Sequence, residues 1–277
     1  MNLVLQGAAL SNDAIGEIVA LTGANHVVAL GPGAWRLTRA AEQPPVQPWC
    51  AQRGLDFAWV PDARRLDDLR LVAMDMDSTL VTIESIDEMG DMLGIRERIA
   101  SITAQAMRGE IDYPESLRRR VAALAGLEET ALERICEQRM HLSPGAEALV
   151  RRCRERGIHT LLVSGGFNFF TAWLRQRLGI DEVLSNVLEI ERGRLTGRVL
   201  GPIVDGDAKA TKLREAMHRL GLRREQVLAI GDGANDIPMM AEAGISVAYR
   251  AKPAVRERAT HVLDYAGLDG ALHLYVE

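Results

Sequence analysis

The sequence lacks the features that mark several classes of protein. Its 277 residues include only three cysteines, Cys50, Cys136 and Cys153, which stand far apart and form no CxxC pair. Such scattered cysteines are typical of reduced thiols in a core or helix, and not of disulfide frameworks or zinc sites. No apolar run reaches the ~18 residues of a membrane span, and no basic segment followed by an apolar one opens the chain. We therefore expect a protein of the reducing cytoplasm.

An excess of charge of one sign is also absent. Lys and Arg total 33 against 38 Asp and Glu, the net charge is -5, and the arginines are interspersed with acids. This pattern is typical of solvated helix faces, so no nucleic-acid partner is expected. No GxxxxGK[ST] loop is present, which argues against P-loop nucleotide hydrolysis. What remains is an ordinary globular composition, with a length that suits one or two domains.

The first 68 residues predict a small α+β domain. Short strands are expected at residues 3–8, 26–31, 34–40 and 55–61, with a helix at residues 11–23 that Ser11 or Asn12 caps and Gly23 ends. A second helix before the last strand would complete a βαββαβ order, although three prolines crowd its start. Residues 61–68 are expected to be a linker.

From residue 69 to residue 277 the pattern changes to strands that alternate with helices. Strands are expected at residues 69–75, 158–166, 226–231, 245–249 and 260–264, helices at residues 143–157, 169–179 and 207–221, and a hairpin at residues 186–200. Ser143 is expected to cap the first of these helices and Gly157 to end it. This alternation predicts an α/β domain with a doubly wound parallel sheet, covered by helices on both faces.

The roughly sixty residues that follow the first of these strands have a pattern that predicts helices and no strands. They span residues 85–142, and Ser85 with Glu88 suggests a capping box at the first helix. The segment is too long for a connection between a strand and a helix, which usually takes a handful of residues. We expect a separate helical cap that lies over the end of the strand before it.

Three of the expected strands end in polar motifs, "MDMDST", "VSGGF" and "GDGAND". Ligands of open parallel sheets bind outside the carboxyl ends of the strands. If the strands are neighbours, one pocket gathers Asp75, Asp77, Ser164, Gly165, Asp232, Asn235 and Asp236. Four carboxylates in one crevice need a cation, and hard oxygen ligands with phosphate nearby favour Mg²⁺.

Each motif alone also has a structural interpretation. Either acid of the DxD pair could cap a helix, and the two glycines after Ser164 could form a turn. Lys209 could be a surface helix lysine, and Arg118, Arg119 and Arg120 could form a solvated face. The combination of these motifs, each at a strand end or helix start, is what favours function.

In this order the motifs "DMDSTL", "VSGGF", a lysine and "GDGAND" resemble the haloacid dehalogenase (HAD) superfamily of phosphatases. The segments "VTIESIDE", "DYPESLRRRV" and "AKATKL" extend the resemblance to the phosphoserine phosphatases within that superfamily. The resemblance covers about residues 70–270 and implies a Rossmann-like core with an inserted cap. The first seventy residues match less well, with room for a single ACT-like regulatory module of degenerate form.

The resemblance implies a catalytic role for two acids. Asp75 would be the nucleophile that forms an aspartyl-phosphate, which divides one difficult displacement into two. Asp77 would protonate the leaving alkoxide and then accept a proton from the attacking water. Mg²⁺ would be held by Asp75, the backbone carbonyl of Asp77, and Asp232.

The remaining roles that the resemblance implies concern the substrate, phosphoserine. Ser164, Gly165 and Lys209 would hold phosphoryl oxygens, with Asn235 and Asp236 supporting the metal, the lysine or the substrate. Glu84 would meet the ammonium group of the substrate, and Arg120 its carboxylate. The expected reaction is the last step of serine biosynthesis.

Other readings stay open at this point. A related phosphatase or phosphotransferase would act on phosphohomoserine or another small phosphomonoester. A non-catalytic, amino-acid-sensing protein on a phosphatase scaffold is a more remote alternative. A homodimer is one alternative for the oligomeric state, and residues 1–68 could either bind a ligand or pack and dimerise.

Overall fold

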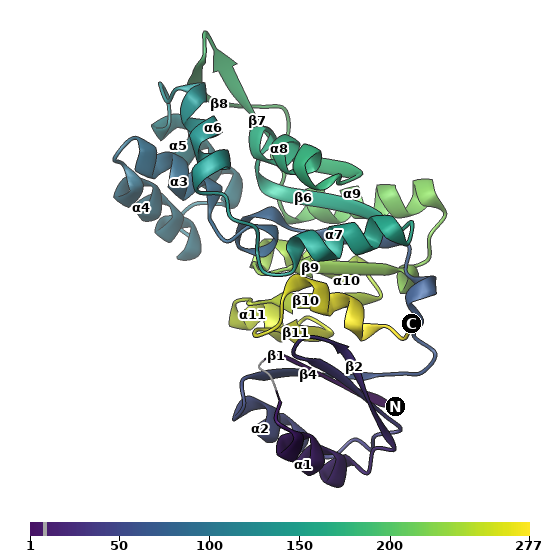
Figure 1. The fold of residues 1–277 in the computed structure, drawn as a ribbon. Helices are drawn as coiled ribbons and strands as arrows, with labels where there is room; N and C mark the ends of the chain where they lie inside the picture. The colour runs from purple at the N-terminus through teal and green to yellow at the C-terminus, as the bar shows by residue number, and fades with distance from the viewer. Residues whose placement is uncertain (8–9) are drawn as a thin grey trace.

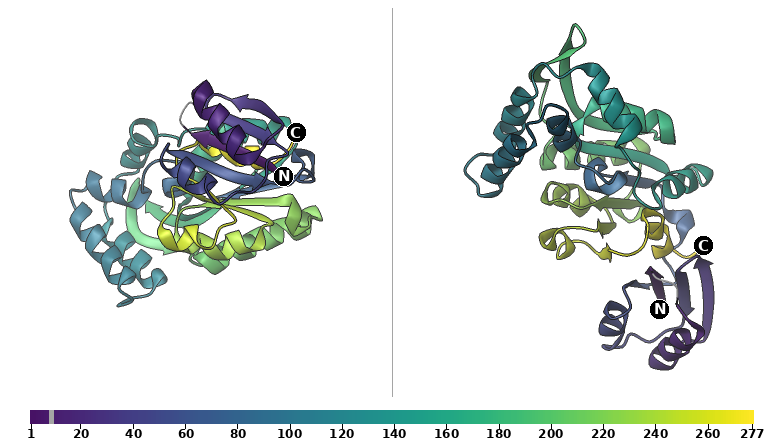
Figure 2. Two further views of the ribbon diagram at one scale, coloured as in Figure 1. Left: turned by 90° about the horizontal axis from the view of Figure 1, so that it is seen from below. Right: turned by 60° about the vertical axis from the view of Figure 1, so that its left-hand side comes forward.

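The computed structural model describes residues 1–7 and 10–277, and it contains two separate β-sheets. Figure 1 and Figure 2 show a small N-terminal unit beneath a larger α/β unit, with a helical lobe projecting from the far side of the larger unit. The predicted fold class is confirmed by this arrangement. Ala8, the last residue of the first expected strand, lies outside the described residues.

The N-terminal unit has the βαββαβ order that the sequence predicts. Its elements are β1 (Asn2–Gly7), α1 (Asn12–Thr22), β2 (His26–Gly31), β3 (Ala34–Thr38), α2 (Val46–Ala51) and β4 (Leu55–Val60). The strands form one antiparallel sheet in the order β2-β3-β1-β4. Ser11 caps α1 by accepting a hydrogen bond from the Ala14 N–H, and Gly23 ends it at φ 62°. The short helix α2 forms because it starts only after Pro45.

One face of the N-terminal sheet packs against the last residues of the chain. The carboxylate of Asp56 accepts hydrogen bonds of 2.8–2.9 Å from the backbone N–H groups of residues 264–266. Arg36 Nη2 donates to the carbonyl oxygens of His273 and Tyr275, at 2.9 and 2.5 Å. The two units are therefore held together by buried polar contacts in addition to the connecting segment.

The larger sheet has seven strands in the order β11-β10-β9-β5-β6-β7-β8. They are β5 (Leu71–Met74), β6 (His159–Phe167), β7 (Glu182–Glu191), β8 (Arg194–Leu200), β9 (Val227–Gly231), β10 (Ile245–Tyr249) and β11 (His261–Leu263). All pairings are parallel except that of β7 with β8, which form the predicted hairpin. The central strands β9, β5 and β6 therefore end side by side at one edge of the sheet.

Helices cover both faces of this sheet. Val72 and Met74 of β5 belong to the cluster that includes α7 (Ala146–Glu155) and α8 (Asn168–Leu178). Leu71 and Ala73 point the other way, toward α9 (Gly206–Leu220) and α10 (Ile237–Glu242). This alternation is the period-two pattern of a strand buried on both faces. The short helix α11 (Pro253–Arg256) precedes β11.

The helical lobe lies between β5 and α7 in the chain. It consists of α3 (Ser85–Met92), α4 (Arg96–Met107), α5 (Tyr113–Ala123) and α6 (Glu129–Gln138). Strand β8 packs against α5, so the hairpin at the edge of the sheet supports the lobe from the side (Figure 1).

Two predicted helix caps are wrong. The N-cap residue of α7 is Gly145 and not Ser143, because Gly145 takes a left-handed φ of 77° and the helix begins only after it, at Ala146. Ser85 forms no capping box with Glu88, since it lies inside α3 and Glu84 is the N-cap residue. Its side chain is directed to Asp77 instead, as described below.

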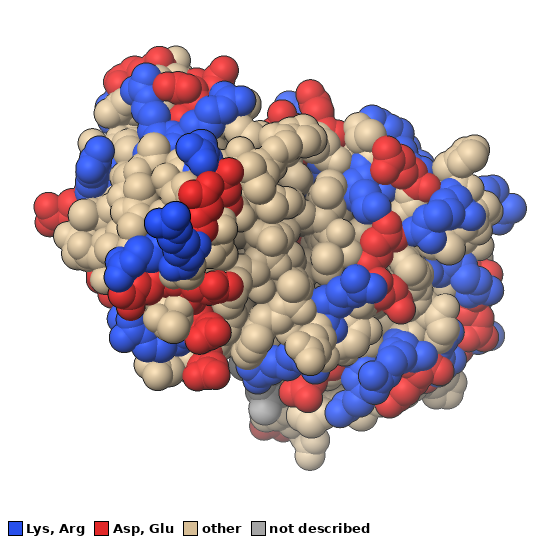
Figure 3. All heavy atoms as spheres, turned by 90° about the horizontal axis from the view of Figure 1, so that it is seen from above, with Lys and Arg blue, Asp and Glu red and all other residues tan. Residues whose placement is uncertain are grey.

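The surface agrees with the balanced composition. Figure 3 shows positive and negative residues interspersed over one face, on either side of a largely uncharged band. None of the helices within residues 1–7 and 10–277 has the length and apolarity that a membrane crossing requires.

Candidate active site

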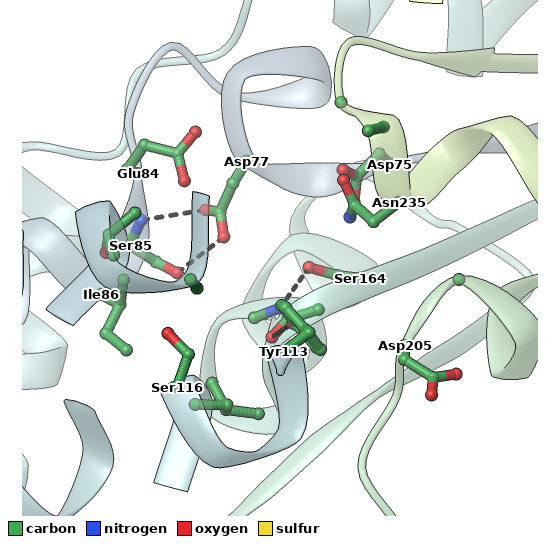
Figure 4. A pocket seen from close by; sticks show the side chains of 18 of the residues that line it. Asp75, Asp77, Glu84, Ser85, Ile86, Tyr113, Ser116, Ser164, Asp205 and Asn235 are labelled. Carbon is green, nitrogen blue, oxygen red and sulfur yellow. Dashed lines mark hydrogen bonds between the residues drawn. The ribbon is translucent and has the colours of Figure 1, made fainter. Parts of the chain in front are cut away.

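A cavity of about 550 Å³ lies between the helical lobe and the carboxyl ends of β5, β6 and β9. Figure 4 shows many of the side chains that line it. Eight of the ten predicted site residues face this cavity, namely Asp75, Asp77, Glu84, Arg120, Ser164, Gly165, Asp232 and Asn235. The other two, Lys209 and Asp236, are fully buried behind it. The structure thus brings together residues from five separate segments of the chain.

Asp75, Lys209 and Asp236 form a buried group of charges. Lys209 Nζ lies 2.7 Å from Asp75 Oδ1 and 2.7 Å from Asp236 Oδ1, and the lysine side chain is fully buried. Burial disfavours the charged lysine, but the two carboxylates outweigh it and raise its pKa. Lys209 is therefore a permanent cation, and the surface-lysine interpretation does not apply to it.

Asp75 also accepts a hydrogen bond of 2.7 Å from the Met76 N–H through the same oxygen, Oδ1. Burial, followed by the charge of Asp236, raises the pKa of Asp75 well above its ordinary value, while Lys209 opposes the shift. A carboxylate in this position gains stability from any additional cation.

Asp77 points away from Asp75, toward the start of α3. Its Oδ1 accepts a hydrogen bond of 3.0 Å from the Ser85 N–H, and its Oδ2 accepts one of 2.9 Å from Ser85 Oγ (Figure 4). Burial, with the nearby charge of Glu84, raises the pKa of Asp77 to about 7 in spite of these bonds. The group can therefore exchange a proton near neutral pH.

The turn after β5 separates the two acids. Asp77 has extended backbone angles and Ser78 a left-handed φ of 56°, so the turn is wider than an α-helical one. Ser78 Oγ donates to Glu84 Oε1 at 2.7 Å, and Thr79 Oγ1 donates to Asp232 Oδ1 at 3.0 Å. These bonds connect the turn both to the lobe and to the end of β9.

The acids at the strand ends fit a divalent cation. Carboxylate oxygens of Asp75, Asp232 and Asp236 lie within 4.8 Å of one another, and all three side chains are buried. Asp236 is already engaged, because Oδ1 contacts Lys209 and Oδ2 accepts from the N–H groups of Asp232 and Gly233. Burial and the charge of Asp236 raise the pKa of Asp232 to about 6. This excess of buried negative charge is what a hard cation would neutralise.

The end of β6 supplies polar groups opposite the acids. Ser164 Oγ accepts a hydrogen bond of 2.8 Å from the Gly166 N–H, which leaves its own proton free to donate into the cavity. A Cβ atom on Gly166 would lie 2.9 Å from Asp77 Oδ2 and 3.0 Å from Ser164 Oγ. A larger residue here would have to displace the ends of the Met76, Asp77 and Ser164 side chains, because the strand end approaches the second acid so closely.

The structure separates the three adjacent arginines of α5. Arg118 and Arg119 are exposed, and Arg119 pairs with Glu115 at 2.7 Å. Arg120 is half-buried and lines the cavity. Glu84 lines the cavity from the start of α3, so a positive and a negative side chain both come from the lobe.

Sequence reasoning missed several residues of the site. Thr79 and Ser85 are fully buried beside the acids, and Tyr113 donates from the lobe to the Gly165 carbonyl oxygen at 3.3 Å. Asn186 donates to the same carbonyl at 2.8 Å from β7. Thr79 stands within "DMDSTL" and Tyr113 within "DYPESLRRRV", so both motifs contained a signal. Asn186 lies in an ordinary strand pattern, with no local signal of its role.

Comparison with known proteins places these residues in a family context. The chain matches the haloacid dehalogenase-like hydrolase family over residues 72–241. Residues 3–45 match a domain of unknown function, DUF4072. A phosphoserine phosphatase from Albidiferax ferrireducens is 52% identical over 216 residues, which are 76% of this chain and 91% of that protein.

Solved structures are similar over the whole chain and over its larger unit. A HAD family hydrolase from Salmonella enterica serovar Typhi has a TM-score of 0.90 at 31% identity, and the match covers 100% of this chain and 99% of the hydrolase chain. The structure of a phospho-aspartyl intermediate analogue of phosphoserine phosphatase has a TM-score of 0.69 at 35% identity, covering 75% of this chain and 99% of its own.

Proposed function

Because this chain belongs to the haloacid dehalogenase-like hydrolase family, we propose that it hydrolyses O-phosphoserine to serine and inorganic phosphate. The observation that carries this proposal is the composition of one cavity. It presents a pair of acids beside phosphate-binding groups at the strand ends, and one cation and one anion, Arg120 and Glu84, from the lobe above. A zwitterionic phosphomonoester has matching groups at both ends.

We assign the nucleophile to Asp75. Its Oδ1 is held by Lys209 and the Met76 N–H, so Oδ2 is the oxygen assigned to attack phosphorus. The attack forms a bond from Oδ2 to phosphorus and breaks the bond from phosphorus to the seryl oxygen. Water then attacks the aspartyl-phosphate, releases inorganic phosphate and restores the carboxylate.

Asp77 is assigned the proton transfers in both steps. In the first step it gives its proton to the departing seryl oxygen, and in the second it takes a proton from the attacking water. A pKa of about 7 suits both tasks near neutral pH. The two bonds from Ser85 fix the carboxylate in the orientation that separates it from Asp75.

Asp75, Asp232 and the backbone carbonyl of Asp77 would hold the cation, for which we propose Mg²⁺. When bound, the cation supplies positive charge next to the phosphoryl oxygens. The Ser164 hydroxyl, the Gly165 N–H and Lys209 would donate to the remaining phosphoryl oxygens. Asn235 would assist from the start of the next helix, and Asp236 would hold Lys209 in place.

A panel of phosphomonoesters tests the proposal. The purified protein is assayed for phosphate release from phosphoserine, phosphohomoserine, phosphothreonine and an aryl phosphate, with Mg²⁺ and with a chelator. We expect the highest kcat/KM for phosphoserine and no turnover in the chelator. A clear preference for phosphohomoserine would favour the related activity, and no turnover of any ester would favour a non-catalytic role.

The same proposal assigns a cellular role. Hydrolysis of phosphoserine is the step that releases serine in serine biosynthesis, so we place the protein there and in the cytoplasm. The free, buried state of all three cysteines agrees with a reducing compartment.

A further inference from the structure

Ser116 presents a buried hydroxyl to the active-site cavity. It lies on α5, one helical turn before Arg120, and its relative exposure is 1%. Within the described residues its Oγ has no hydrogen-bond partner, although the residue lines the cavity. Figure 4 shows this oxygen pointing from α5 toward the side of the cavity where Ser85 and Ile86 lie.

An unpaired hydroxyl in this position is unusual for a helical serine. Serine inside a helix commonly satisfies its hydroxyl with the carbonyl group four residues earlier. Here the Asp112 carbonyl accepts from the Ser116 backbone N–H at 3.0 Å, and the Ser116 Oγ does not join it. A buried polar group without a partner costs stability, so a polar partner that comes from the cavity would gain by binding there.

The position of Ser116 on the helix identifies that partner. Residues four apart lie on the same face of a helix, so Ser116 and Arg120 face the cavity together, and Arg120 Nε donates to the Ser116 carbonyl oxygen at 3.4 Å. A carboxylate offers about four lone-pair sites, of which a guanidinium fork uses two. A hydroxyl donor beside the fork can therefore take a third site.

We propose that Ser116 is a specificity-determining residue whose hydroxyl donates a hydrogen bond to the α-carboxylate of the bound phospho-amino acid, beside Arg120. This inference rests on the proposed function, since it deepens the recognition of the same substrate. Ser116 takes no part in bond making or breaking. It selects esters that carry a carboxylate at the correct distance from the phosphate.

The test compares Ser116→Ala with the wild-type protein on esters that lack one group each. Phosphoserine has both groups, phosphoethanolamine lacks the carboxylate, and 3-phosphooxypropanoate lacks the ammonium. Each compound competes against hydrolysis of an aryl phosphate, so an inhibition constant is obtained whether or not the compound is turned over. Ser101→Ala, an exposed serine of the neighbouring helix α4, is the matched control.

We expect Ser116→Ala to raise the inhibition constants of phosphoserine and 3-phosphooxypropanoate roughly tenfold to a hundredfold. This is the effect of losing a hydrogen bond to a charged group. The inhibition constant of phosphoethanolamine should stay unchanged in Ser116→Ala, and all values should stay unchanged in Ser101→Ala. The melting temperature of Ser116→Ala should be equal or higher, because alanine favours the helix and removes an unpaired polar group.

Equal inhibition constants in Ser116→Ala and wild type would overturn the inference. Weaker inhibition by phosphoethanolamine, with unchanged inhibition by 3-phosphooxypropanoate, would also overturn it. That result would mean that the hydroxyl binds the ammonium group of the substrate. A lowered melting temperature with equal losses on all esters would show a purely structural role. Failure of the proposed function is distinct, because wild-type protein would then neither hydrolyse nor bind phosphoserine.

Discussion

At the scale of single residues, the phase of one helix determines which of three adjacent arginines reaches the cavity. The sequence contains Arg118, Arg119 and Arg120 in a row, and only the helical phase distinguishes them. Each residue turns the side chain by about 100° around the helix axis, so Arg120 faces the cavity together with Ser116 while its two neighbours face solvent. The recognition that we propose for the amino-acid end of the substrate therefore depends on the phase of α5.

Charge removal at the lobe should affect phosphoserine selectively. Glu84→Gln removes the proposed partner of the substrate ammonium, and Arg120→Ala removes the proposed partner of its carboxylate. Each change should lower kcat/KM for phosphoserine. The expected fall corresponds to a loss of roughly 2–5 kcal/mol of transition-state stabilisation. Steady-state kinetics on phosphoserine and on an aryl phosphate measure the difference.

The matched control for that prediction is Arg119→Ala, because this exposed arginine pairs with Glu115 and does not line the cavity. Arg119→Ala should leave kcat/KM unchanged for both phosphoserine and the aryl phosphate. Equal losses on phosphoserine and the aryl ester in Arg120→Ala would indicate that the arginine supports the lobe and does not bind the substrate.

Sequence reasoning reached some residues of the site and not others, for a physical reason. Asp75, Asp77 and Asp232 were recognisable because acids at the ends of apolar strands contradict their surroundings. Ser116 and Asn186 were not, because a serine in a helix and an asparagine in a strand are common and their partners lie far away in sequence. Tertiary contacts alone give these two residues their positions.

At the scale of elements, the lobe and the end of β6 meet at one close contact. Tyr113 at the start of α5 donates to the Gly165 carbonyl oxygen, 52 residues away in the chain. A Cβ atom on Gly165 would clash with the Tyr113 hydroxyl oxygen. A larger residue at this position would therefore have to displace the Tyr113 hydroxyl at the start of the lobe helix α5.

This contact predicts a rescue experiment. Gly165→Ala keeps the backbone N–H but pushes against the tyrosine hydroxyl, so it should displace the lobe and lower kcat/KM for phosphoserine. Tyr113→Phe in the same chain removes the clashing oxygen, since the next nearest tyrosine atom, Cζ, is at 3.5 Å, and it should restore much of the activity. Kinetics of the two single variants and the double variant form the test.

A double variant that is no more active than Gly165→Ala would show that the loss arises elsewhere, for instance at the strand end itself. Tyr113→Phe alone should have a small effect. It loses one hydrogen bond of 3.3 Å but keeps the aromatic ring in the wall of the cavity.

Element order and type followed from periodicity, but element boundaries did not. The alternation of strands and helices predicted the parallel sheet and the inserted lobe. The N-cap of α7 was missed by two residues because Gly145 adopts a left-handed conformation that the preceding Ser-Pro pair does not reveal. The short helix α2 formed in spite of three nearby prolines, since two of them precede it.

At the scale of the whole molecule, the acids of the site couple stability to pH and to the cation. Burial and neighbouring charges raise the pKa of Asp232 to about 6 and that of Asp77 to about 7, from an ordinary value of 3.8. At pH values between the ordinary pKa and the raised ones, the folded, cation-free protein binds protons that the unfolded chain has released. The contribution of these two groups to the stability of the folded protein is therefore greatest below about pH 4. This contribution is lost as the pH rises through about 7.

The melting temperature in a chelator should consequently fall between about pH 5 and about pH 8. A bound divalent cation would replace the missing protons, so the increase in melting temperature on addition of Mg²⁺ should be larger at the higher pH. Thermal unfolding at both pH values, with and without Mg²⁺, measures this. Asp232→Asn should reduce both the pH dependence and the effect of Mg²⁺, and an effect of Mg²⁺ that is independent of pH would contradict the linkage.

The most direct test of the account is to trap the covalent intermediate on Asp75. Wild-type protein is mixed with phosphoserine and Mg²⁺, quenched in acid, and treated with borohydride, which reduces an acyl phosphate. Mass spectrometry of the peptides should then locate the modification at Asp75, and Asp75→Asn should show neither this product nor measurable turnover. Turnover of phosphoserine by Asp75→Asn, or a phosphoryl group found on Ser164 in place of Asp75, would contradict the account.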